Sequence, residues 1–256
     1  MALISSNTLF HFTSSSENLI SILRNEFQPR LSLESFAHIV RYVTNSPWMT
    51  ESGVPMVCFC DIPLSQVGSH MEHYGDYGIG LSKEWGMRHH ISPVMYIHGE
   101  SAPAESAAQL AVLWLKLRAG EVLSEFEPLA LRAGALLYFL KAYEGVLERR
   151  GKELIEVRFY NEREWRYVPP EVESIPAISR ADFADPTKRG AVEAIVAQLP
   201  ALSFEPQDIR YLVVAKDSEV LPMIHAVRSV KDRYDPDTID NLTSRIVSAE
   251  RIRADF

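Results

Sequence analysis

Three short polar segments carry the residue types that could perform chemistry or bind a ligand. The first is His11-Phe12-Thr13, where strand alternation would place the His11 imidazole and the Thr13 hydroxyl on the same face. Two such groups, aimed the same way from the end of a strand, can bind a ribose or an amide. They can equally satisfy neighbouring backbone groups, and the segment alone does not separate these interpretations.

The second segment covers residues 70–85 and combines aromatic residues with glycines. Aromatic faces stack on planar rings, and glycines let a ring approach the backbone closely. His70, Glu72 and His73 are residue types of a zinc site, but their spacing matches no closed ligand set, so we expect no metal. Neither the Gly-Lys-Ser/Thr pattern nor the Rossmann glycine spacing occurs, which argues against a phosphate loop.

The third segment covers residues 161–167. Glu162 and Glu164 are two apart, so on an extended chain both carboxylates face one side and Trp165 faces the other. Two carboxylates held together repel each other, so one is neutralised or held by a cation such as Arg166. A charged strand edge is the structural alternative, and a bulge would change which glutamate points into a pocket. We expect the three segments to converge on a single ligand site.

The composition predicts an ordinary globular protein, because hydrophobic residues make up 46% and charged residues 23% of the chain. A length of 256 residues is at the upper end of one domain, so we expect a single domain over residues 1–256, and two domains are possible. The formal net charge of −8 argues against a surface that binds nucleic-acid phosphates over most of its area. The charge is compatible with a local basic groove. Cys58 and Cys60 would share one face of a strand as buried thiols, which suits a reducing compartment.

Targeting signals are not evident in the sequence. Residues 1–8 lack the basic start and apolar stretch of a secretory signal. The longest apolar run, residues 107–117, is broken by Gln109 and Lys116 and is too short for a membrane span. We therefore expect no membrane contact and a cytoplasmic location.

Strands and helices must position the three segments. A strand at 9–13 leads into a helix that begins at a Ser-Ser-Ser-Glu capping pattern, residues 14–17. Residues 25–53 favour an irregular excursion suited to a lid, with one strand at 38–43. Further strands are expected at 56–60, 77–81, 93–97, 154–160, 164–168 and 209–215, and helices at 64–74, 189–199 and 218–227, followed by an extended tail through Ile246.

The middle of the chain changes character. Apolar residues recur at helical spacing over 103–120 and 128–149, with Gly120 and Gly151 as stops, and predict a two-helix insertion at about 103–150 beside a mostly β body. Leu113, Trp114 and Leu117 would form an apolar face on the first helix. That face either packs into the core or docks a second chain.

The order of four motifs resembles the AbiGi family of bacterial abortive-infection, phage-resistance proteins. The motifs are Phe10-His11-Phe12-Thr13, Val57-Cys58-Phe59-Cys60-Asp61-Ile62-Pro63-Leu64, residues 70–85 with the core Tyr74-Gly75-Asp76-Tyr77-Gly78-Ile79-Gly80-Leu81, and Glu162-Arg163-Glu164-Trp165-Arg166. The likeness covers most of the chain apart from the helical insertion. The family is described as an antitoxin component, which implies a cognate toxin or antitoxin partner.

A histidine-aromatic-threonine strand, a glycine- and aromatic-rich strand and a late Glu-x-Glu are similar, more distantly, to the layout of ADP-ribosyltransferases, including DarT-type toxins that modify nucleic acid. This likeness implies an α+β fold with a mixed-sheet ADP-ribosyltransferase-like core, NAD as substrate, and nucleic acid or protein as acceptor. His11 and Thr13 would hold the ribose and the nicotinamide-proximal groups of NAD. Tyr74 or Tyr77 would stack on the nicotinamide.

The same likeness implies roles for the charged segment. Glu164 would be the catalytic carboxylate, which stabilises the positive charge that grows on the sugar as nicotinamide leaves. Glu162 would orient the acceptor or act as its base. Arg166 would hold a phosphate or pair with Glu164.

Two functions therefore compete. One is an ADP-ribosyltransferase that halts phage multiplication, and the other is a non-enzymatic antitoxin or sensor that binds a cognate toxin or phage protein. Several branches of the transferase superfamily use a Ser-Thr-Ser strand to support the catalytic glutamate, and this sequence has no clear strand of that kind. A degenerate, non-enzymatic version of the fold that binds a partner is therefore an alternative. For a third class, a metal-dependent nuclease or other hydrolase, the sequence offers no convincing two-metal carboxylate set.

Overall fold

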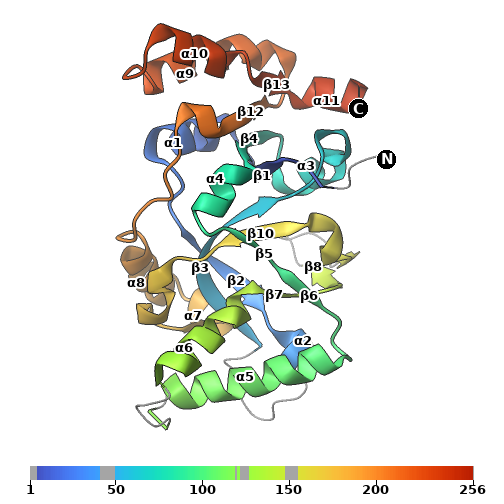
Figure 1. Ribbon diagram of the computed structural model, residues 1–256, viewed down its shortest axis with the longest axis vertical. Helices are drawn as coiled ribbons and strands as arrows, with labels where there is room; N and C mark the ends of the chain where they lie inside the picture. Colours follow the sequence, from blue (N-terminus) through green and yellow to red (C-terminus); the bar gives the residue numbers. More distant parts are fainter. Residues whose placement is uncertain (1–4, 41–49, 119, 122–126, 148–154, 256) are drawn as a thin grey trace.

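A nine-stranded mixed sheet runs through the centre of the molecule (Figure 1). The structure is a computed structural model that describes residues 5–40, 50–118, 120–121, 127–147 and 155–255. The strands are β1 (Thr8–Thr13), β2 (Arg30–Ser35), β3 (Glu51–Cys60), β4 (Tyr77–Ser82), β5 (Ser92–Pro93), β6 (Met95–Ile97), β7 (Leu140–Ala142), β8 (Gly145–Leu147), β9 (Ile155–Val157), β10 (Glu164–Tyr167), β11 (Ile178–Ser179), β12 (Ile209–Val214) and β13 (Ile246–Ser248). The helices are α1 (Ser16–Asn25), α2 (Ala37–Val40), α3 (Gly68–Tyr74), α4 (Lys83–Arg88), α5 (Ala102–Arg118), α6 (Glu127–Ala135), α7 (Arg180–Ala184), α8 (Pro186–Val196), α9 (Val220–Val230), α10 (Pro236–Thr243) and α11 (Ala249–Asp255).

The strand order explains why distant segments become neighbours. The main path is β13-β12-β4-β1-β3-β10-β5, and β2 and β11 pair with the N-terminal part of β3. β12 and β13 run parallel, whereas β4, β1, β3 and β10 pair antiparallel. The expected α+β class with a mixed sheet is thereby confirmed. β3 is the hub, because it joins the N-terminal strand to the charged strand β10.

Helices cover both faces of this sheet. On one face, which we call the α1 face, α1, α4 and α9 pack over a core that includes Leu9, Phe59 and Trp85. On the opposite face, the α3 face, α3 and α11 pack over Phe10 and Cys60. α1 begins within the predicted capping segment, but its N-cap is Ser15, which accepts a hydrogen bond from the Asn18 amide, one residue later than a box between Ser14 and Glu17 would place it.

The glycines of β4 accommodate rings from the neighbouring strand. Phe12 lies opposite Gly78, and Phe10 lies opposite Gly80. A Cβ atom at Gly78 would stand 2.8 Å from the Phe12 ring, and one at Gly80 would stand 2.7 Å from the Phe10 ring. The close approach that these glycines allow is therefore used by the protein's own aromatic side chains.

The helical insertion is shorter than predicted. α5 matches the first expected helix, but α6 ends at Ala135 and the chain continues through the 3₁₀ helix Leu136–Phe139 into β7, which pairs with β6. Successive apolar residues do not distinguish a helix from a strand, and pairing with β6 decides the outcome here. The predicted end of this helix and its stop at Gly151 lie outside the described residues.

The apolar face of the insertion belongs largely to the core. Trp114 packs edge-on against Tyr138, with ring centroids 6.4 Å apart, and Leu117 is partly buried. Leu113 is 42% exposed. α5 and α6 lie at the far end of the molecule from α9 and α10 (Figure 1).

Two further expectations were wrong. The strand expected at 38–43 is replaced by α2 where it is described, and the strand lies earlier, in β2; residues 41–49 of the expected lid lie outside the described residues. The extended tail through Ile246 contains α10, whose start combines a capping Asp235 with Pro236 at the first helical position. These capping signals outweigh the weak apolar pattern of the tail.

Cys58 and Cys60 are free and alternate onto the same side of β3, as expected. Burial raises the pKa of both thiols. Within the described part of the chain, no helix combines the length and apolar character needed to span a membrane.

Candidate functional site

The predicted site residues lie on opposite faces of the sheet. Cys60 of β3 lies opposite both Phe10 of β1 and Glu164 of β10, so these three side chains share the α3 face. His11 and Thr13 alternate with Phe10 and face the other way, toward the α1 face. The prediction that the three polar segments converge on one ligand site is therefore wrong, because the sheet separates the first segment from the third.

His11 is a buried residue with its own partners. Its Nδ1 atom donates a hydrogen bond to the Cys58 carbonyl oxygen at 2.8 Å, and its ring packs edge-on against Phe27 and Phe59. Burial lowers the pKa of His11, which keeps the imidazole neutral. These contacts correspond to the alternative in which the imidazole satisfies a neighbouring backbone group.

Thr13 and Tyr77 are opposite each other in the β1–β4 register and also have local partners. The Thr13 hydroxyl oxygen accepts a hydrogen bond from the Asn18 side chain at 2.9 Å. The Tyr77 hydroxyl donates to Glu219 at 2.7 Å, and this hydrogen bond is the main reason why the pKa of Tyr77 rises to about 12.

The charged residues of β10 form a buried ion network on the α3 face. Arg166 is fully buried and donates through Nε to Glu164, and through another nitrogen to Glu34 of β2 at 2.6 Å. Lys141 of β7 binds the second oxygen of Glu164 and also Glu162, the latter at 2.8 Å. Three carboxylates thus share two cations, and both oxygens of Glu164 carry a charged partner.

The electrostatics of Glu164 follow from this enclosure. Burial by itself would raise its pKa, but the charges of Lys141 and Arg166 outweigh that effect and lower the pKa to about 2. Its backbone amide donates a hydrogen bond to the Tyr96 hydroxyl at 2.8 Å. Glu164 is therefore ionised at any physiological pH and fully engaged with the protein.

Tyr74 joins the same network from α3. Its hydroxyl donates to Glu162 at 2.6 Å, and burial together with the Glu162 charge raises its pKa. Of the predicted site residues, the structure thus brings together Tyr74, Glu162, Glu164 and Arg166. It leaves His11, Thr13 and Tyr77 on the α1 face.

Sequence reasoning missed the residues that complete the network. Lys141 lies in a segment that was expected to be helical, and Glu34 lies in a segment that was expected to be irregular. The Tyr138 carbonyl oxygen, which accepts from Arg166 at 2.8 Å, belongs to the same misassigned segment. The only available signal was the pair of carboxylates at Glu162 and Glu164, which called for a cation without indicating that Lys141 would supply it.

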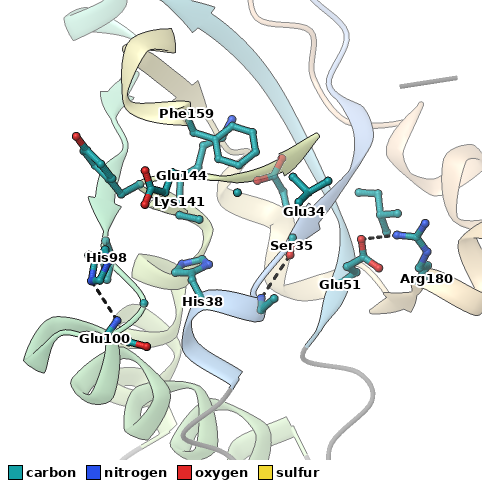
Figure 2. A pocket seen from close by; sticks show the side chains of 18 residues that line it. Glu34, Ser35, His38, Glu51, His98, Glu100, Lys141, Glu144, Phe159 and Arg180 are labelled. Atoms are coloured by element: carbon teal, nitrogen blue, oxygen red, sulfur yellow. Dashed lines mark hydrogen bonds and ion pairs between the residues drawn. The ribbon is translucent and has the colours of Figure 1, made fainter. Parts of the chain in front are cut away.

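A pocket of about 940 Å³ opens next to the network (Figure 2). Glu34 and Lys141 belong both to the network and to the pocket wall, whereas Glu164 is not among the lining residues. Carboxylates at Glu51, Glu100 and Glu144 and the cation Arg180 complete the charged lining. Arg180 is paired with Glu51 at 2.5 Å, and Lys141 is paired within the network.

One buried side chain in this pocket has no partner. His38 of α2 is 8% exposed, and neither ring nitrogen makes a hydrogen bond to the described residues. Figure 2 shows its ring directed from α2 into the pocket, on the side of Lys141. Within the described ranges, no three or more His, Cys, Asp or Glu side chains are grouped so that they could hold a metal ion, and this includes His70 and His73.

The chain resembles proteins of phage defence. A model of the family described as "Putative abortive phage resistance protein AbiGi, antitoxin" matches residues 25–215. The "Abortive phage resistance protein AbiGi" of Lactococcus lactis subsp. cremoris is 29% identical over 252 residues, covering 90% of this chain and 99% of that protein. No solved structure matches the chain. The matched range contains the whole ion network and the pocket, but neither His11 nor Thr13.

Proposed function

This chain belongs to the AbiGi family of abortive phage resistance proteins, and we propose that it acts there as an antitoxin, a protein that holds a cognate toxin without performing chemistry on it. Its part in phage resistance follows from the family. The binding mode is our inference, and it rests on the state of Glu164.

The environment of Glu164 is the observation that carries this proposal. A catalytic carboxylate needs at least one oxygen free to meet the substrate where charge develops. Here Arg166 binds one oxygen and Lys141 the other. Removing either cation would leave a buried carboxylate without its charged partner and would strongly destabilise the folded protein. We therefore infer that the network supports the fold and does not form a reaction centre.

The placement of His11 supports the same proposal. In the transferase layout the histidine and the glutamate must act on the same NAD molecule. The strand register puts His11 on the α1 face and Glu164 on the α3 face. A dinucleotide bound on one face of the sheet would therefore meet only one of them.

Growth rescue at graded doses tests the antitoxin proposal. The protein encoded by the neighbouring gene, as the candidate toxin, is expressed at a fixed level, and this chain is expressed at increasing levels beside it. A protein that acts by binding rescues growth only as its level approaches that of the toxin, by mass action. Full rescue at about a tenth of the toxin level would instead indicate catalysis and contradict the proposal.

An NAD-dependent ADP-ribosyltransferase is the second candidate. Its support is the order of the motifs along the chain and the pocket that begins at Lys141, the shared partner of Glu162 and Glu164. NAD would be its substrate, and nucleic acid or protein would be the acceptor. For this function Lys141 must move away from Glu164 when the substrate binds.

Nicotinamide release separates the two candidates. Purified protein is incubated with NAD and either nucleic acid or cell lysate, beside the variant Glu162→Gln. The transferase predicts release and transfer that fall sharply in the variant, while its melting temperature falls by no more than about 2–4 °C. The antitoxin proposal predicts no release above a protein-free blank and no thermal shift on adding NAD.

A further inference from the structure

The unpartnered imidazole of His38 is the least expected feature of the pocket. A buried polar group without a hydrogen bond destabilises the folded protein. Burial and the nearby Arg166 charge lower the pKa of His38 to about 4, so the ring is neutral at pH 7. One ring nitrogen can then donate a hydrogen bond and the other can accept one, and a donor group on a ligand in the pocket can satisfy the accepting nitrogen.

The charges around His38 define what such a ligand must carry. Four carboxylates line the pocket, at Glu34, Glu51, Glu100 and Glu144, against the two cations Lys141 and Arg180. Both cations are already engaged by carboxylates, and Glu34 and Glu51 are themselves paired with Arg166 and Arg180. No hydrogen bond or ion pair joins Glu144 to another described residue, so its charge is available. The described lining therefore favours a cation and disfavours a phosphate.

We propose that this pocket receives a basic side chain of a protein partner, with its guanidinium or ammonium group held between His38 and the pocket carboxylates. This inference rests on the proposed antitoxin function and names the chemistry of the contact with the toxin. Lysine and arginine carry only donors, which match the carboxylates and the accepting nitrogen of His38. A neutral imidazole also does not repel the incoming charge.

The size and walls of the pocket fit a side chain delivered by a larger molecule. A volume of about 940 Å³ exceeds that of one side chain and leaves room for neighbouring residues of the partner. Phe159 in the wall already faces a cation, since the Lys141 ammonium lies 5.1 Å from its ring centroid. The aliphatic part of an arginine or lysine can pack against such a wall.

A labelled peptide provides the direct test. The full-length protein is titrated with a short fluorescent peptide that has two arginines among glycines, with a glutamine-substituted peptide as comparison. Glu144→Gln removes one pocket charge at an exposed position. Glu84→Gln removes an exposed charge on α4, on the opposite face of the sheet, and is the matched control.

The expected results separate the pocket from general attraction to an acidic protein. The arginine peptide binds, the glutamine peptide does not, Glu144→Gln weakens binding roughly tenfold and Glu84→Gln leaves it unchanged, because a hydrogen-bonded charge pair contributes about that factor. Equal affinity of both variants overturns the proposal. Competition by NAD but not by free arginine overturns it as well and assigns the pocket to an anionic ligand.

A second variant gives a readout that a purely structural role would not produce. His38→Phe replaces the unpartnered polar ring by an apolar one, so the ligand-free protein should unfold at the same or a higher urea concentration while peptide affinity falls at least roughly tenfold. A variant that loses stability and keeps the affinity shows that His38 serves the fold alone.

Failure of this inference is distinguishable from failure of the antitoxin proposal. Growth rescue that follows the toxin dose, without any binding of the arginine peptide, rejects the pocket as the contact and retains the antitoxin. Peptide binding without growth rescue rejects the toxin as the source of the basic side chain.

Discussion

Arg166 lies at the centre of the buried ion network. It has no exposed surface, and it bonds two carboxylates and one backbone carbonyl oxygen. Bringing such a charge out of water is unfavourable, and only complete pairing compensates for that cost. Each member of the network is therefore required by the others, whatever the protein binds.

Glu164→Gln should destabilise the protein by about 3–5 kcal/mol, because it leaves Lys141 and Arg166 with one charged partner fewer in a buried site. Glu162→Gln is the matched control and should cost about 1 kcal/mol, because Lys141 keeps its ion pair with Glu164 and the neutral amide can still accept a hydrogen bond. Urea unfolding curves of the three proteins measure the difference. A Glu164→Gln protein as stable as the wild type would show that the network is not structural.

His38 makes stability depend on pH. Its folded-state pKa of about 4 lies below the ordinary value of 6.5, so the neutral form is favoured on folding and stability is lost as the pH falls from 6.5 toward 4. Near pH 5 the loss through this group is about 2 kcal/mol. Urea unfolding at about pH 7.5 and pH 5 measures how much unfolding free energy is lost between the two pH values. This loss should be smaller in His38→Phe than in the wild type by about 2 kcal/mol. An equal loss in both proteins would contradict the lowered pKa of His38.

The charged pairing was partly predictable at the residue scale. The two-residue spacing of Glu162, Glu164 and Arg166 indicates a shared side and a need for a cation, and the structure confirms the pairing of Glu164 with Arg166. Lys141 and Glu34 lie in β7 and β2, two strands that the sequence pattern did not predict. They reach Glu164 and Arg166 only because β7 pairs with β6 and β2 pairs with β3, and no local sequence pattern indicates such pairing.

Elements with explicit start and stop signals were predicted best. β4 and α1 lie close to where alternation and capping placed them, and β10 begins at Glu164 as expected. α6 and β7 were merged into one helix because the run Leu136–Phe139 is apolar at every position. In such a run, pairing with β6 decides between helix and strand, and the sequence alone cannot.

Substitution by alanine should affect stability differently at the two glycines at the ends of α3. Gly75 has a φ of 112°, and a Cβ there would stand 2.3 Å from the Thr13 carbonyl oxygen, so Gly75→Ala should cost about 2–3 kcal/mol. A Cβ at Gly68 would meet no neighbouring atom within 4 Å, and Gly68→Ala should leave stability unchanged or raise it by up to about 0.5 kcal/mol. Thermal unfolding of both variants provides the comparison. Similar losses in both would contradict the close approach of α3 to β1.

At the scale of the whole molecule, the sheet decides which predicted residues can cooperate. One strand register sends His11 and Glu164 to opposite faces. Sequence motifs fix the order of candidate residues but not the face to which each strand turns them. The pocket beside Lys141 lies next to the ion network, and its acidic lining has the same sign as the net charge of −8.

We infer that this protein binds its partner without modifying it. The most direct test is to co-express it with the protein encoded by the neighbouring gene, isolate the complex by size exclusion, and measure the intact mass of the partner. Our account predicts that the partner co-elutes with this chain and has the mass calculated from its own sequence. A partner recovered free, with the added mass of an ADP-ribosyl or other group, would contradict it.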